Sequence, residues 1–105
     1  MAFDVKLTGY SQHDGAVLLA MEPGWWNAWE LMKDPRFVAS CNDGYMDHDA
    51  RLTVAETKEL HERYRANAAD FRAEQVAQLD RALTDDAAEY SHFDVQVFEW
   101  ESGLG

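Results

Sequence analysis

The sequence predicts a small α+β domain in which N- and C-terminal strands form an antiparallel sheet, with two to four helices packed on one face. Apolar and polar residues alternate in Ala2–Thr8 and again in His92–Glu101, which is the pattern of strands with one buried face. Between these strands, residues 53–83 carry apolar side chains at helical spacing. Strands at the two ends of a chain most simply pair with each other, and the intervening helices then cover their apolar side.

The first half of the chain contains a second strand and a first helix. Ser11–Gly15 has the composition of a turn, and the short apolar run Ala16–Met21 that follows it is interpreted as a strand rather than a buried helix. Because proline is tolerated in the first turn of a helix, we expect a helix over residues 23–33. Pro35 ends it, and residues 37–39 form either a brief helical turn or a strand.

The middle of the chain is predicted as a loop followed by two helices. Ser40–Asp49 is polar and contains the turn signal Asn42-Asp43-Gly44. Thr53 and Glu56 match a capping box, which places a helix start at Thr53. The apolar spacing continues to residue 83 but is interrupted by a five-residue step after Phe71, so a break near residues 67–70 is favoured over one long helix. Residues 87–91 are expected to form a loop or a short helical turn before the last strand.

Length and charge restrict the domain organisation and the partners. A chain of 105 residues has the usual size of one domain, so we expect residues 1–105 to fold as a single unit. The 20 acidic and 9 basic residues give a formal charge of -11. This charge repels nucleic acid and anionic membrane surfaces, and it favours a protein partner with a basic surface.

The cysteine content and the N-terminal residues indicate a cytoplasmic protein. Cys41 is the single cysteine, so no internal disulfide can form, which suits a reducing compartment. Residues 1–10 include Asp4 and Lys6 among apolar positions and do not resemble a signal peptide. The longest apolar run is too short to cross a bilayer.

No sequence motif predicts catalysis or a cofactor. The chain contains no P-loop, GxGxxG or GxSxG pattern, which favours a role other than that of an enzyme. Residues 45–56 resemble a degenerate EF-hand calcium loop, with oxygen ligands supplied by Asp47, Asp49, Thr53 and Glu56. However, Ala50 stands where that loop needs glycine, and a helix cap accounts for Thr53 and Glu56 without a metal. We therefore assign no metal site.

Exposed acidic and aromatic side chains are the predicted partner-binding residues. Tryptophan is a favoured interface anchor, and acidic groups accelerate encounter with a basic partner. The candidates are Trp26, Asp43, Asp47, Asp49, Asp85, Asp86 and Trp100.

Three functions are consistent with these features. The favoured one is an acidic protein-binding module, most concretely an immunity or inhibitor protein that neutralises a basic toxin such as a nuclease. The second is a structural or regulatory subunit that self-associates, for example as a homodimer, through an exposed strand edge near Phe98 and Trp100. The third is a small metal-dependent protein that uses the Asp43–Asp49 loop.

Overall fold

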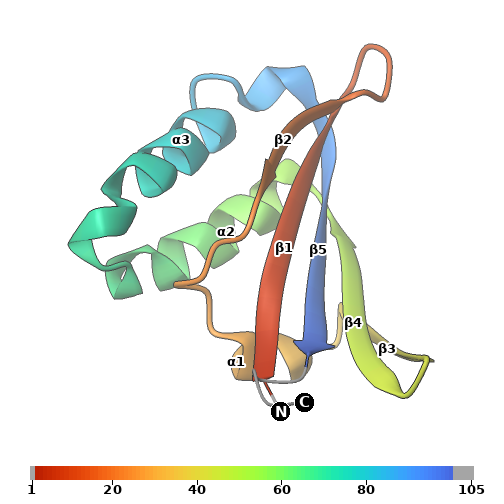
Figure 1. The fold of residues 1–105 in the computed structure, drawn as a ribbon. Helices are drawn as coiled ribbons and strands as arrows, with labels where there is room; N and C mark the ends of the chain where they lie inside the picture. Colours follow the sequence, from red (N-terminus) through yellow and green to blue (C-terminus); the bar gives the residue numbers. More distant parts are fainter. Residues whose placement is uncertain (1, 101–105) are drawn as a thin grey trace.

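The structure is a computed structural model that describes residues 2–100, the side chain of Asn42 excepted, and it has five strands and three α-helices there (Figure 1). The strands are β1 (Ala2–Ser11), β2 (Val17–Met21), β3 (Val38–Asn42), β4 (Tyr45–Leu52) and β5 (Tyr90–Trp100). The α-helices are α1 (Ala28–Met32), α2 (Val54–Tyr64) and α3 (Ala73–Leu83). None of the described helices is long and apolar enough to cross a membrane.

The five strands form one antiparallel sheet in the order β2-β1-β5-β4-β3. The predicted pairing of the two terminal strands is confirmed, because Ala2 pairs with Trp100 and the register continues to Tyr10 opposite His92. Glu101, the predicted end of the last strand, lies outside the described residues. The strand predicted over Ala16–Met21 is also confirmed.

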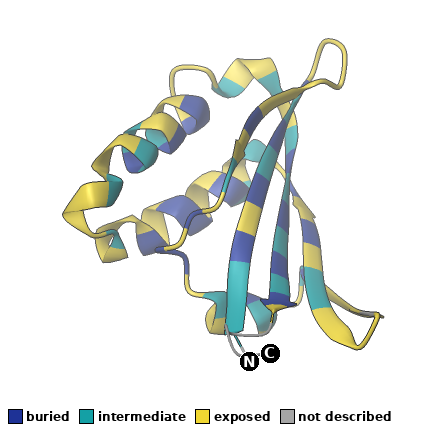
Figure 2. Cartoon of the chain, viewed as in Figure 1, coloured by how far each residue is buried: buried dark blue, intermediate teal, exposed yellow. Residues whose placement is uncertain are grey.

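All three helices lie on one side of this sheet, as the sequence predicts (Figure 1). The helices cover one side because β1 and β5 each have one apolar face: along both strands, buried positions alternate with less buried ones (Figure 2). The inward-facing side chains pack against the apolar faces of α2 and α3 and form a single core. Its members with almost no solvent exposure include Leu7, Leu52, Leu60, Leu79, Phe93, Val95 and Val97.

The helix predicted over residues 23–33 begins later than expected, and this prediction is corrected. Pro23 opens a turn instead, in which the Trp26 backbone N–H donates to the Pro23 carbonyl at 2.9 Å. The helix begins after Asn27, whose side chain accepts a hydrogen bond from the Glu30 backbone N–H. Asparagine is a strong N-cap residue, and this cap fixes the start of α1 at Ala28.

The loop predicted over Ser40–Asp49 is a β-hairpin, so that prediction is wrong. The turn signal itself is correct, because Asp43 and Gly44 both have positive φ and connect β3 to β4. The flanking residues are strands because β4 pairs with β5 in register from Asp47 opposite Phe98 to Leu52 opposite Phe93. The ambiguous segment after Pro35 is likewise a strand, β3.

The capping box and the helix break are both confirmed. Thr53 caps α2, with its side chain accepting from the Glu56 backbone N–H and the Glu56 carboxylate accepting from the Thr53 backbone N–H. Between α2 and α3, the chain forms two short 3-10 turns, Arg65–Asn67 and Asp70–Arg72. The chain reverses direction at these turns, so that α2 and α3 contact each other on the same side of the sheet (Figure 1).

Candidate functional site

The side of the sheet opposite the helices is the candidate site, and we call it the open face. No described helix lies on it (Figure 1), and its residues come from alternate positions of the four strands β1, β5, β4 and β3. Its members include Asp4, Lys6, Thr8, Tyr10, Val38, Ser40, Tyr45, Asp47, Asp49, Arg51, His92, Asp94, Gln96, Phe98 and Trp100.

The register places these residues in rows that run across the strands. Phe98 on the central strand β5 lies between Asp4 on β1 and Asp47 on β4. In the next row, Gln96 lies between Lys6 and Asp49. Side chains opposite each other in an antiparallel pair are direct neighbours, so an aromatic ring is flanked by carboxylates on both sides.

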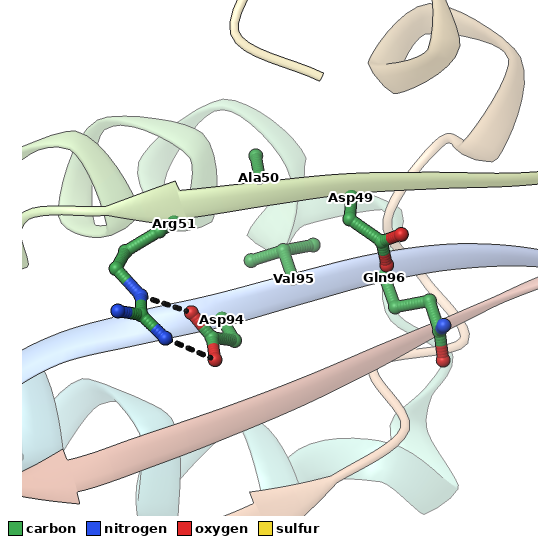
Figure 3. Close-up of a pocket in the computed structure, with 6 residues that line it drawn as sticks. All are labelled: Asp49, Ala50, Arg51, Asp94, Val95 and Gln96. Atoms are coloured by element: carbon green, nitrogen blue, oxygen red, sulfur yellow. Dashed lines mark hydrogen bonds and ion pairs between the residues drawn. The ribbon is translucent and has the colours of Figure 1, made fainter. Parts of the chain in front are cut away.

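A shallow hollow of about 310 Å³ lies on the open face between β4 and β5. Figure 3 shows Asp49 and Gln96 close together at one end, and Arg51 with Asp94 at the other. The Arg51 Nε atom donates to Asp94 Oδ1 at 3.0 Å. One end of the hollow is therefore formed by the Arg51–Asp94 ion pair. The other end is formed by the Asp49 carboxylate, which makes no ion pair with any described residue.

The open face carries an excess of negative charge. Four aspartates stand against one lysine and one arginine, a net charge of -2 if His92 is neutral. Partial burial raises the pKa of the Asp49 carboxyl, and the negative charges of Asp47 and Asp94 raise it further against the opposing hydrogen bond from Gln96. A cation placed beside Asp49 would relieve this repulsion.

The structure brings together only some of the residues predicted to bind a partner. Asp47, Asp49 and Trp100 share the open face, and the Trp100 side chain is 39% exposed. Asp43 lies at the tip of the β3–β4 turn, near the end of the sheet where β5 finishes. Asp85 and Asp86 follow α3 and precede β5, so they lie at the opposite end of the sheet (Figure 1).

Trp26 is not a surface residue, and the prediction of a partner contact there is corrected. Its side chain is only 3% exposed, and its ring lies 6.2 Å from that of Tyr64 on α2. The turn that replaces the expected helix start directs it into the core. The exposed member of the tryptophan group is Trp29 on α1, which packs edge-on against Phe3.

The calcium loop suggested by residues 45–56 is not formed. Asp47 and Asp49 project from a β-strand onto the open face, whereas His48 between them points to the helix-covered side. Thr53 and Glu56 bond to each other's backbone in the helix cap. Among residues 2–100, no group of three or more histidine, cysteine or acidic side chains could hold a metal ion.

Sequence reasoning missed Asp4 and Asp94 and misjudged the role of the last strand. Both aspartates are visible in the sequence as the polar positions of alternating strands, but only the strand order shows that they share a face with Asp47. The strand containing Phe98 and Trp100 was expected to have an exposed edge. It is instead the central strand of the sheet, so its exposed aromatic groups belong to a face.

A scan of protein-family models, a search of curated proteins and a search of solved structures find no match to this chain.

Proposed function

We propose that this chain is a protein-binding module whose open face docks a partner with a basic surface. The observation that carries the proposal is the combination, on one uncovered sheet face, of exposed aromatic side chains and unneutralised carboxylates. Aromatic groups supply contact area at interfaces, and the surrounding acidic groups select a partner of opposite charge.

The overall charge of the chain supports the same partner. A formal charge of -11 attracts a basic protein at long range, and it repels nucleic acid and anionic lipid. The most concrete form of the proposal is an immunity or inhibitor protein that neutralises a basic toxin such as a nuclease in the cytoplasm. A nuclease needs a positive surface to bind phosphates, and an acidic face could cover that surface.

The test begins with the partner that co-purifies at low salt and is released at high salt. Its association rate is then measured by stopped-flow fluorescence with the wild-type chain and with Asp47→Lys/Asp49→Lys. Because complementary charge acts mainly on the association rate, we expect this rate to fall about tenfold at low salt, with a smaller change in the dissociation rate.

The matched control is Asp85→Lys/Asp86→Lys, which changes the net charge equally at the other end of the sheet. We expect it to slow association less than the open-face variant does. An equal effect of both variants would contradict docking on the open face, since only the net charge would then matter. Failure of any basic protein to bind would overturn the proposed function.

A further inference from the structure

We propose that Asp4, Phe98 and Asp47 together bind an arginine side chain of the partner. We call these three residues the arginine row. This inference rests on the proposed function and specifies the chemistry that the partner must present. The three residues come from β1, β5 and β4 and lie opposite each other in the sheet register. They thus form a short line with an aromatic ring at its centre and a carboxylate at each end.

The width of the arginine row favours a guanidinium over an ammonium group. Asp4 and Asp47 are separated by two strand spacings, which places their backbones about 9.6 Å apart. Strand side chains stand roughly perpendicular to the sheet, so the separation of the two carboxylates follows that of their backbones. An ammonium that donates to two carboxylates at about 2.8 Å each can join oxygens no more than about 5.6 Å apart. A guanidinium spreads five donors over a planar fork and therefore reaches further to both sides.

The central ring adds a contact that arginine uses better than lysine. Phe98 is partly exposed on the open face, and Trp100 lies two residues further along the same strand on the same side. Guanidinium groups are attracted to aromatic faces, and their flat shape also allows them to stack. A guanidinium over Phe98 would have its edges directed at the two flanking carboxylates.

The carboxylates of the arginine row have no cation of their own in the part of the chain that the structure describes. Arg51, the open-face arginine, pairs with Asp94 instead. Neither Asp4 nor Asp47 forms an ion pair with another described residue. Partial burial and, after it, the negative charges of Asp47 and Asp94 raise the pKa of the nearby Asp49 carboxyl. The other described cation of the open face, Lys6, lies one row away from Asp4.

The test compares two flexible peptides of equal length and charge, one with four arginines and one with four lysines separated by glycine and serine. Binding to the full chain is followed by the shifts of backbone amide NMR signals at low salt. Because the total charge is the same, long-range attraction is the same for both peptides. We expect the arginine peptide to bind about tenfold more tightly and to shift the signals of β1, β4 and β5 most.

Two variants test the arginine row itself. Phe98→Leu keeps an apolar side chain and removes the ring, and Asp4→Asn removes one flanking charge; each should reduce the preference for arginine to about twofold or less. Asp85→Asn serves as the control and should leave the preference unchanged.

The outcomes separate the two proposals. Equal binding of the two peptides, or an arginine preference that survives both variants, would refute the arginine row while leaving the docking face intact. Failure of both peptides to bind the open face would count against the docking face as well.

Discussion

Asp34, in the loop between α1 and β3, should contribute measurably to stability through its contacts with Arg36. The Arg36 Nε and backbone N–H groups both donate to Asp34 Oδ1 at 2.9 Å, and Nη2 donates to Oδ2 at 2.6 Å. The Asp34 side chain is only 13% exposed. These hydrogen bonds, chiefly those from the Arg36 side chain, lower the pKa of the Asp34 carboxyl from 3.8 to about 2 against the opposing effect of burial.

The lowered pKa gives the size and the pH range of the effect. One pKa unit corresponds to about 1.36 kcal/mol, so the ionised Asp34 stabilises the fold by about 2 kcal/mol at neutral pH. Because the folded-state pKa lies below the ordinary value, this contribution is fully present above about pH 5 and is lost as the pH falls towards 2. At pH 3, about half of it should remain.

The assay is urea unfolding of the wild-type chain and of Asp34→Asn at pH 7, 5 and 3, followed by tryptophan fluorescence. We expect the variant to be less stable by about 2 kcal/mol at pH 7 and by about 1 kcal/mol at pH 3. Asp85→Asn is the control, since Asp85 is exposed and forms no hydrogen bond or ion pair with the described residues. A stability difference for Asp34→Asn that is small at pH 7, or that does not narrow by pH 3, would refute this reasoning.

Three further substitutions test the packing, the helix cap and the His61–Asp80 hydrogen bond by the same unfolding assay. Gly9→Ala should lower stability by about 1–3 kcal/mol because the new Cβ atom would lie 2.6 Å from the ring of the fully buried Phe93; an unchanged midpoint would show that the ring can shift. Thr53→Ala should lower stability by about 1 kcal/mol through loss of the α2 cap, and an effect near zero would show that water replaces it. Asp80→Ala should lower stability by about 1–3 kcal/mol because the buried His61 loses its partner at 2.6 Å, and no loss would contradict a structural role for this pair.

The fold class and the two terminal strands, β1 and β5, follow from the sequence because their patterns are local. Alternation in Ala2–Thr8 and in the segment after His92 requires one buried face, whatever the neighbouring strands are. The capping box at Thr53 likewise needs only the residues within the first helical turn. These features therefore appear in the structure where the sequence predicts them.

The hairpin of β3 and β4 could not be predicted because its sequence lacks a clear apolar alternation. Met46, Asp47, His48 and Asp49 are polar or partly exposed on both faces, which is typical of a loop. They form a strand because β5 offers a hydrogen-bonding edge in register, a long-range contact that no local pattern encodes. The resemblance of residues 45–56 to a calcium loop misled for the same reason, because pairing with β5 makes residues 45–52 a strand rather than a loop.

The sequence by itself determined the acidic character, the α+β class and the existence of two strands with one polar side. Only the tertiary structure decided which polar sides meet. The order β2-β1-β5-β4-β3 places residues 4, 98 and 47 side by side, although they are far apart along the chain. Strand order depends on how all the helices and strands pack around a common core. It is therefore a property of the whole chain and cannot be inferred from any one segment.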